Sequence, residues 1–570
     1  MGEYGGAGAG ASSLRSWAPS PTVVIWCTLL LRYMVSLWPY SGQGDKPMHG
    51  DFEAQRHWME ITTNLPLAQW YRFDVDFWGL DYPPLTAYVS WACGQLSGVV
   101  EPASMALGLS RGYETPSHKA FMRLTVLILD LAIFFPAAAA LARRLTRRNG
   151  GTGVVPARHW EAAGTKAFLM VLLQPALVLI DHGHFQYNSV CLGLAMAAAA
   201  AVASGDRRGE LVGSVLFALS LNFKQMALYY APAFFFYLLA SCIWGPAGGS
   251  TVGGWRTDGT VAARWTGVIG RVGGLGVVVA LTFALLWVPF CVYPHHEDGG
   301  GCLSSLGQAS SPTARVLLRL FPFSRGLFED KVANFWFCMD VVFKLRRNVS
   351  PKMALATTLS LLGPIGGEIL RPGRPLTARR LLLAMFNSSM AFFLCSFQVH
   401  EKSLLLPLCP LAFLWQDAPM FVTWVQVVGV FSMTPLLGRE RLLVPCAVCT
   451  TLYCGASWVL APRPPAAVRN PGGSPRSAFP YGRHLTQWRL RAAVILSFGG
   501  MAVLLALEAA FRPPPALPHL FPTLNALYSC ANLVVAYGIG VCWQWREGGD
   551  PRDGAEGGAR RLVAERKKRQ

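Results

Sequence analysis

Continuous apolar runs separated by short polar links recur along most of the chain. About 20 apolar residues are enough for one helix to cross a bilayer. The clearest runs are 22–38, 124–142, 273–292, 381–399, 420–437, 442–461, 492–511 and 524–543. Weaker runs are 85–100, 167–180, 190–204, 211–221, 226–244 and 353–370. Because the apolar residues are continuous rather than alternating, we expect an all-α polytopic membrane protein with about 11 to 14 transmembrane helices.

The composition agrees with this pattern. Of 570 residues, 52% are hydrophobic and only 14% are charged, whereas soluble domains carry about 25% charged residues. The net charge of +19 does not indicate a nucleic-acid partner, because the basic residues lie mostly in loops and tails and form no basic domain with interleaved aromatic residues. The composition therefore favours a membrane protein, and no nucleic-acid partner is expected.

Basic loops give the expected orientation, because the cytosolic loops of membrane proteins are enriched in Lys and Arg. The basic segments that predict the cytosolic side are 143–148, 207–208 and 560–570. The opposite face then receives mainly the polar loops 39–83, 181–188, 293–332 and 399–403. These loops are rich in acids, His, aromatic residues and Pro. Side chains suited to chemistry are therefore expected on the non-cytosolic face.

The expected organisation is one large membrane domain with polar tails. Residues 1–21 form a cytosolic N-terminal tail, and the membrane domain covers 22–545. Residues 462–489, rich in Pro, Arg and Gly, form a cytosolic loop inside it. Residues 546–570 form a basic cytosolic C-terminal tail.

The region 333–380 admits two topologies. Basic segments at 344–352 and 371–380 flank the single run 353–370, so both cannot be cytosolic if that run crosses once. Either 333–344 is an interfacial helix and 344–352 is non-cytosolic, or 353–370 is re-entrant. We favour the first topology, because 333–344 is too short to span a bilayer.

The stretch HGDFEAQRHWME, residues 49–60, is a dense polar cluster soon after the first apolar run. Residues 51–61 are expected to form one helix with Asp51 at its N-cap, where an acid is favoured. One interpretation is an amphipathic helix at the membrane interface. The other makes Asp51 a functional carboxylate, because ionisable groups near a bilayer are costly and need partners.

Three further motifs carry candidate chemistry. YRFDVDFWGLDYPPL places acids among aromatic residues, which suits sugar binding but is also common at a membrane interface. DHGHFQYN could ligate a metal through its histidines, or form a polar turn that lines a cavity. SFQVHEKS sets His400, Glu401 and Lys402 at a membrane boundary, where they could bind a phosphate or form a snorkelling charge pair.

Six motifs occur in order and together resemble one family. They are DFEAQRHWME, WGLDYPPLTAY, DHGHFQYN, LNFKQM, FPFSRGLFEDKVANFW and SFQVHEKS. They resemble the dolichyl-phosphate-glucose-dependent glucosyltransferases of asparagine-linked glycosylation, which have the GT-C membrane fold. The resemblance covers roughly residues 20–545. It is greater to the enzymes that add the first glucose than to those that add the second, which share DYPP and VHEK but differ in the first motif and at Gly183.

The resemblance implies a reaction and its partners. Glucose from dolichyl phosphate glucose would be added in α-1,3 linkage to the nine-mannose oligosaccharide on dolichyl diphosphate. The protein would lie in the endoplasmic reticulum membrane, in contact with its lipids, with lumenal loops carrying the active site and a cytosolic C-terminus. The tail ends Lys567-Lys568-Arg569-Gln570, which fits a dilysine retrieval signal, although a basic membrane-proximal tail explains it equally well.

The resemblance also implies roles for individual residues. A β-linked donor and an α-linked product require one inverting displacement, so one base suffices, and in the family this base maps onto Asp51. Phosphate contacts are assigned to the basic residues His400, Lys402 and Arg325. Sugar contacts are assigned to Trp78, Asp81, Tyr82, His182 and His184. No metal and no other cofactor is expected.

Some questions stay open at this level. A polytopic transporter is the competing hypothesis from another class, although transporters place ionisable groups at mid-membrane and the acids here cluster in loops on one face. A disulfide between Cys291 and Cys302 is possible if their loop is oxidised. Asn348 stands in a glycosylation sequon followed by Pro351.

Overall fold

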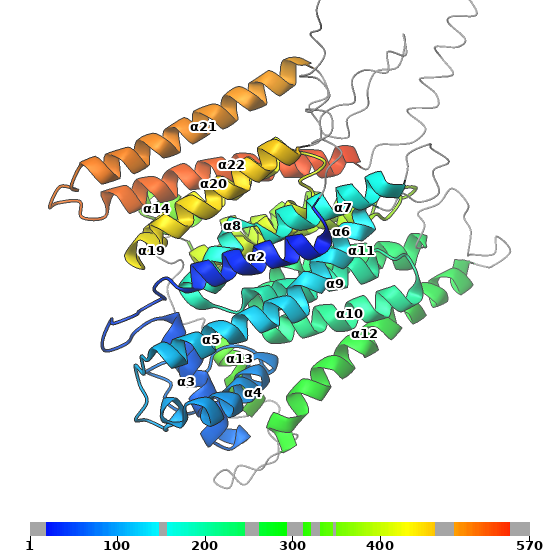
Figure 1. Cartoon of the computed structure of the whole chain (residues 1–570). Coiled ribbons are helices and arrows are strands. Elements are labelled where there is room, and N and C mark those ends of the chain that lie inside the picture. The colour runs from blue at the N-terminus through cyan, green and yellow to red at the C-terminus, as the bar shows by residue number, and fades with distance from the viewer. Residues whose placement is uncertain are drawn as a thin grey trace, which may run out of the picture.

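The described part of the chain is built from helices. The computed structural model describes residues 19–146, 157–245, 261–292, 312–320, 331–345, 349–461 and 484–547. Within these ranges the regular elements are helices and none is a strand. Figure 1 shows the long helices running side by side in one bundle. The all-α class predicted from the apolar runs is confirmed.

Helix starts follow local sequence signals. In α2, Pro21–Ser36, the side chain of Ser20 accepts a hydrogen bond from the amide of Val23 at 3.2 Å, and Pro21 occupies the first helical position. In α5, Pro116–Leu129, Thr115 caps the amide of His118 in the same way. Both starts satisfy an otherwise unpaired donor at a helix N-terminus.

Six described helices are long and apolar enough to cross a membrane. They are Pro116–Thr146, Gln225–Trp244, Trp265–Phe290, Leu443–Leu460, Trp488–Ala510 and Leu520–Glu547. A seventh span results if the pair Ala162–Leu172 and Pro175–Phe185, bent by 45°, counts as one. Together with the family described below, these helices make the protein a multi-pass membrane protein.

Other predicted runs form helices that are shorter than a full span. The helices α2, α9 (Asn188–Val202) and α18 (Pro419–Ser432) are apolar but have fewer than 18 residues. The run 381–399 lies mostly in α16, Ala378–Cys395, whose side chains are almost all buried. Helices enclosed by other helices contact little lipid, so their length is less tightly fixed by the bilayer.

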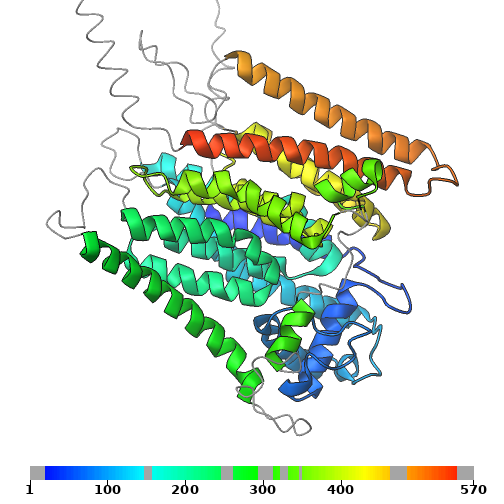
Figure 2. The ribbon, with the colours of Figure 1, turned by 180° about the vertical axis from the view of Figure 1, so that it is seen from behind.

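The core lies around α16 and α17, Leu405–Phe413, which pack against each other and against their neighbours α9 and α18. Two helices lie at the edges instead. In α12, Val261–Val292, and α21, His484–Ala510, only 6% and 22% of the residues in the apolar window are buried. Figures 1 and 2 show these two helices on opposite sides of the bundle. Their exposed apolar side chains suit contact with lipid.

One end of the bundle carries a compact group of helices. In both views α3 (Asp51–Asn64), α4 (Pro84–Val100) and α13 (Pro312–Leu320) gather near the start of α5 and the end of α12. The helix α4 covers the weak apolar run 85–100, but it packs against α3 and is not one of the candidate spans. This end of the bundle holds the site described below.

Several predictions fall at the limits of the described residues. The helix α14, Phe335–Phe343, has nine residues and is too short to span, as predicted, and α15 covers Pro351–Ile369. Which side of the membrane α14 and α15 face stays a prediction.

The helix α21 begins at His484, so residues 484–489 belong to this helix and not to the predicted loop 462–489. Outside the described residues lie 1–18, 462–483, 548–570, Cys302, Arg325 and Asn348, and the side chain of Cys291.

Candidate active site

Asp51 is the first residue of α3, and its carboxylate faces a cluster of cations. Gly50, with an extended backbone, occupies the N-cap, and no side chain caps this helix start. The prediction that Asp51 is the N-cap is therefore wrong by one position. The amide of Asp51 donates instead to the hydroxyl of Ser41 at 3.2 Å. The carboxylate is thus available for contacts outside its own helix.

Three donors meet at one oxygen of the Asp51 carboxylate. The Nζ of Lys402 lies 2.6 Å from Oδ2, the Nε2 of His184 lies 3.0 Å from it, and the amide of Gln186 also donates to it. The other oxygen, Oδ1, accepts no hydrogen bond from the described part of the chain. One carboxylate oxygen is therefore fixed while the second remains available to a bound molecule.

These neighbours keep Asp51 ionised. Burial alone would raise the pKa of Asp51, but the charges of Lys402 and His184 outweigh burial and hold this pKa well below its usual value. Burial also lowers the pKa of Lys402, and here the Asp51 carboxylate outweighs it, so that the pKa of Lys402 is raised. At neutral pH the pair is a carboxylate beside an ammonium.

The DHGHFQYN motif begins in a buried π-helix, and two of its residues, His184 and Gln186, line cavities, as expected of the polar segment. In η4, Leu179–Phe185, the two histidines face different partners. His184 contacts Asp51, whereas the Nε2 of His182 lies 3.0 Å from Asp130 Oδ2, which is also paired with Arg32 at 2.5 Å. The two histidines therefore do not converge on one point, and no group of three or more His, Cys, Asp or Glu side chains suited to a metal occurs among the described residues.

The LNFKQM motif orients Gln186. The Nζ of Lys224 donates to Gln186 Oε1 at 3.0 Å and to Asn188 Oδ1 at 2.6 Å. Since an ammonium can only donate, the carbonyl of Gln186 must face Lys224 and its NH2 group must face Asp51. Asn188 in turn donates to Asp181 at 2.7 Å. The sequence reasoning quoted this motif but gave Lys224 no role.

Two cavities meet at Asp51 and Lys402. The first has a volume of about 570 Å³ and opens between the 39–51 loop and the turn at 436–441. The second has a volume of about 350 Å³ and lies between α3, the 75–82 loop, α13 and the start of η7, Glu401–Leu404. Asp51 and Lys402 line both cavities. A molecule in either cavity can therefore reach the same carboxylate.

The predicted site residues distribute unevenly over these cavities. Besides Asp51 and Lys402, which line both cavities, four of them line the second cavity, namely Trp78, Asp81, Tyr82 and His400. His184 lines the first cavity. His182 lines neither of these two cavities, because it is turned toward Asp130, so its predicted sugar contact gains no support. Arg325 lies outside the described residues.

Sequence reasoning missed several charged residues of the cavity walls, and two of them, Arg319 and Glu440, matter most for the argument below. Arg319, on α13, lines the second cavity. Arg319 stands six positions before the predicted Arg325. The sequence thus indicated the right region of the chain but a different arginine. Glu440 lines the first cavity and contacts His184. It comes from a polar turn between apolar runs, which offered no motif by which to find it.

Comparison with known proteins identifies the family. A profile described as the ALG6, ALG8 glycosyltransferase family matches residues 27–539. The chain belongs to this family.

The probable dolichyl pyrophosphate Man9GlcNAc2 alpha-1,3-glucosyltransferase of Dictyostelium discoideum is 42% identical over 440 residues, which are 76% of each chain. Two dolichyl pyrophosphate Man9GlcNAc2 alpha-1,3-glucosyltransferases match nearly the whole length. That of Gallus gallus is 38% identical over 92% of this chain and 96% of its own. That of Saccharomyces cerevisiae is 34% identical over 93% and 91%.

Membership in the ALG6, ALG8 glycosyltransferase family confirms the resemblance that the six motifs indicated. The transporter hypothesis is left without support. In this family member the first motif forms α3, in which Phe52 to Thr62 are buried. The alternative of an amphipathic helix at the membrane interface is therefore wrong. The polar side chains of α3 are enclosed by protein.

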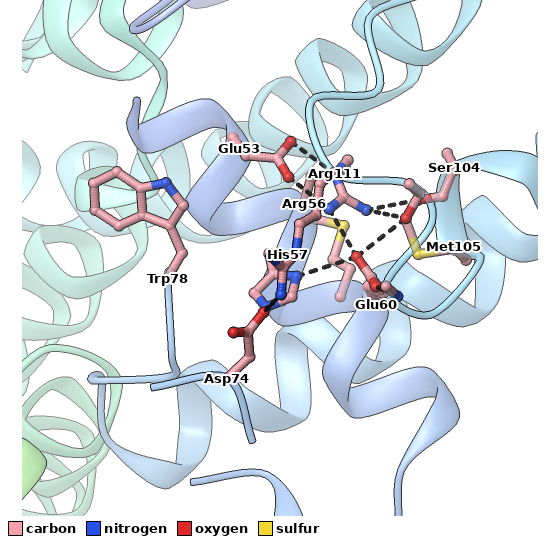
Figure 3. A network of polar contacts seen from close by, with 12 residues as sticks. Glu53, Arg56, His57, Glu60, Asp74, Trp78, Ser104, Met105 and Arg111 are labelled. Atoms are coloured by element: carbon pink, nitrogen blue, oxygen red, sulfur yellow. Dashed lines mark hydrogen bonds and ion pairs between the residues drawn. The ribbon is translucent and has the colours of Figure 1, made fainter. Parts of the chain in front are cut away.

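Figure 3 shows how α3 accommodates its charges. Arg56 is fully buried and pairs with Glu53 at 2.6 Å and with Glu60 at 2.7 Å. It also donates to the carbonyl of Ser104 and the hydroxyl of Ser110. These contacts tie α3 to the 101–115 loop. The charged side chains Glu53, Arg56 and Glu60 thus hold α3 and this loop together.

A second branch of this network holds the loop that carries Trp78. His57 lies 3.1 Å from Glu60 and 3.4 Å from Asp74, and Arg111 also pairs with Asp74. In Figure 3 the Trp78 ring points away from these ion pairs. Its indole donates to the carbonyl of Met48 at 2.5 Å. The network thus anchors one end of the 74–78 segment, and Trp78 lines the second cavity at the other end.

Proposed function

We propose that this protein transfers glucose from dolichyl phosphate glucose, in α-1,3 linkage, to the Man9GlcNAc2 oligosaccharide on dolichyl diphosphate. The activities by which its relatives are named support this acceptor and linkage. The observation that carries the proposal is the ionised carboxylate of Asp51, placed where two cavities meet. A bisubstrate transfer needs one base that both substrates can approach.

Asp51 is proposed as the general base. Its free Oδ1 accepts the proton of the acceptor hydroxyl as that oxygen forms a bond to C1 of glucose. The bond between C1 and the phosphate oxygen breaks in the same displacement, and the electron pair leaves with the phosphate. One displacement converts a β-linked donor into an α-linked product, so a single carboxylate suffices, unlike in glycoside hydrolases, which use two.

The second cavity is proposed to hold the donor. His400, Lys402 and Arg319 line it and can face a phosphate. Positive charge at the leaving phosphate stabilises the transition state because negative charge develops there. Trp78 and Tyr82 offer aromatic faces for the glucose, and Asp81 can accept from its hydroxyls. Arg325 remains a proposed helper at this end.

The first cavity is proposed to hold the end of the acceptor glycan. It is lined by polar groups suited to sugar hydroxyls, including Ser41, Asp45, Glu114, Arg439 and Arg441. It is the larger of the two cavities and would receive an oligosaccharide rather than a single sugar. Its wall reaches Asp51, so an acceptor hydroxyl at its inner end lies beside the base.

The location follows from the lipid-linked substrates. We place the protein in the endoplasmic reticulum membrane, with the α3 end of the bundle in the lumen and the C-terminus in the cytosol. The basic segments at 143–148, 207–208 and 560–570 support this orientation.

A transfer assay with two acceptors tests the proposal. Purified protein in detergent is given dolichyl phosphate glucose and either the nine-mannose acceptor or the same acceptor already carrying one glucose. We expect transfer of one glucose to the first acceptor only. Transfer only to the glucosylated acceptor would assign the second glucosylation step instead. No transfer to either acceptor by folded protein would contradict the proposed function.

A further inference from the structure

His184 lies between two carboxylates. Its Nδ1 is 2.6 and 2.7 Å from the two oxygens of Glu440, and its Nε2 is 3.0 Å from Oδ2 of Asp51. The side chain of His184 is 2% exposed and that of Glu440 is 8% exposed. Both carboxylate oxygens of Glu440 therefore contact the imidazole, although Glu440 also lines the first cavity.

This arrangement defines the protonation of the imidazole. An ionised carboxylate can only accept hydrogen bonds, so each ring nitrogen that faces one must carry a hydrogen. With Glu440 on Nδ1 and Asp51 on Nε2, both ring nitrogens face carboxylate oxygens, and this arrangement favours the imidazolium. Lys402, 3.2 Å from Nε2, is the other cation in contact with the ring and shares Asp51 with it.

The turn that carries Glu440 is rigidly held. Glu440 follows α19, Thr434–Arg439, and precedes α20, Leu443–Leu460. The amide of Leu442 donates to the carbonyl of Leu437 at 2.8 Å, and both leucine side chains are fully buried. The Glu440 amide also bonds to the carbonyl of Leu436 at 3.3 Å. The carboxylate is thereby presented to His184 from a fixed backbone.

We propose that Glu440 is a positioning residue for glucosyl transfer, which orients the His184 imidazolium so that its Nε2–H fixes Oδ2 of Asp51. This inference rests on the proposed function, in which Asp51 is the base. With Oδ2 occupied by His184, Lys402 and Gln186, Oδ1 is the oxygen left to receive the acceptor proton. Glu440 itself need not touch a substrate.

A double-mutant cycle separates this role from substrate binding. The variants are Glu440→Gln, His184→Gln and the two combined, assayed for transfer with saturating and limiting amounts of each substrate. Glu440→Gln keeps an acceptor oxygen but loses the charge. We expect kcat to fall about tenfold to hundredfold, the range seen when an outer carboxylate that orients a histidine is lost. Each KM should change less than about twofold, because no substrate contact is removed.

The combined variant decides how Glu440 acts. If it acts through His184, the double variant has the same kcat as the His184→Gln variant alone. Losses that multiply, or a raised acceptor KM with kcat unchanged, would overturn the proposal and make Glu440 a substrate contact. Glu440→Asp keeps the charge and should lose less activity than Glu440→Gln. An equal or larger loss would contradict the charge argument.

Three controls distinguish a loss of the positioning role of Glu440 from general damage to the protein and from an error in the proposed function. Asp417→Asn removes a carboxylate that pairs with Arg379 at 3.0 Å and lines neither cavity, and it should leave kcat unchanged. Thermal unfolding in detergent is followed for every variant. If Glu440→Gln does not fold, the cycle is run with Glu440→Asp, which must likewise add nothing to His184→Gln. Wild-type protein that transfers no glucose contradicts the proposed function rather than the role of Glu440.

Discussion

The carboxylate of Asp51 and the ammonium of Lys402 lie 2.6 Å apart, although the residues are 351 positions apart in the chain. Asp51 begins α3, and Lys402 lies in η7, which precedes the buried helix α17. Since Lys402 lines both cavities, one cation can lower the pKa of the base and also face the leaving phosphate.

Replacement of the base should abolish transfer without unfolding the protein. Asp51→Asn keeps the shape of the side chain but removes the proton acceptor. We expect the transfer rate to fall at least about 10² to 10⁴-fold, the usual contribution of a general base. The measurement is product formation by protein whose thermal unfolding matches the wild type. Near-normal transfer by this variant would remove Asp51 from the base role.

Loss of the Lys402 charge should act on both the base and the phosphate. Lys402→Met should lower kcat about 10² to 10³-fold. It should also raise the pKa of Asp51, so the acid limb of the kcat/KM profile moves to higher pH, because a base must be ionised to act. Lys402→Arg keeps the charge and should move this limb least. An unchanged acid limb in Lys402→Met would contradict the electrostatic role.

The buried network of α3 should contribute to stability rather than to chemistry. Arg56→Met leaves two buried carboxylates, Glu53 and Glu60, without their cation. Breaking such a pair costs about 3 to 5 kcal/mol in the free energy of unfolding. Arg111→Met is the matched control, because Arg111 is 46% exposed and such pairs contribute about 1 kcal/mol or less. Equal losses in the two variants, measured by denaturation in detergent, would contradict this difference.

The same network predicts how stability depends on acid. Burial raises the pKa of Glu60, but contacts with His57 and Arg56 outweigh burial and lower this pKa to about 2. A carboxyl with a lowered pKa stabilises the folded state above its unfolded value of 4.5 and loses this contribution as pH falls toward 2. The difference in unfolding free energy between wild type and Glu60→Gln should thus be constant above pH 5 and shrink below it. A difference that grows with acid would contradict this account.

Two glycines near the start of α3 should differ in their tolerance of alanine. Both Gly42 and Gly44 have positive φ angles, of 73° and 80°, which cost alanine about 1 to 2 kcal/mol. A Cβ on Gly42 would lie 1.9 Å from the backbone nitrogen of Gly50, whereas one on Gly44 meets nothing within 4 Å. Gly42→Ala should therefore displace the residue before Asp51 and lower kcat. Gly44→Ala should lower stability alone, and equal effects on kcat would contradict the argument.

Some of this site could be predicted from sequence because its residues stand in long motifs. Asp51, His184, His400 and Lys402 were found in this way, and the structure places them around the two cavities. The side to which a side chain turns was not predictable. His182 and His184 are two positions apart, and only the local π-helix shows that they face different partners.

The remaining differences have physical reasons as well. Hydropathy counts apolar residues but does not show where a helix begins and ends, so the runs that form α9 and α18 were predicted as spans although these helices have fewer than 18 residues. Glu440 stands alone between two apolar runs, and only the tertiary structure brings it to His184. Arg319 was overlooked because the motif suggested another arginine.

The two cavities on either side of Asp51 have a consequence for the order of events. Neither substrate would need to leave before the other arrives, since each cavity reaches the carboxylate by its own wall. No glucosylated enzyme is required as an intermediate. Initial-rate plots at varied donor and acceptor should therefore intersect, as in ternary-complex kinetics, and should not run parallel as in a ping-pong reaction.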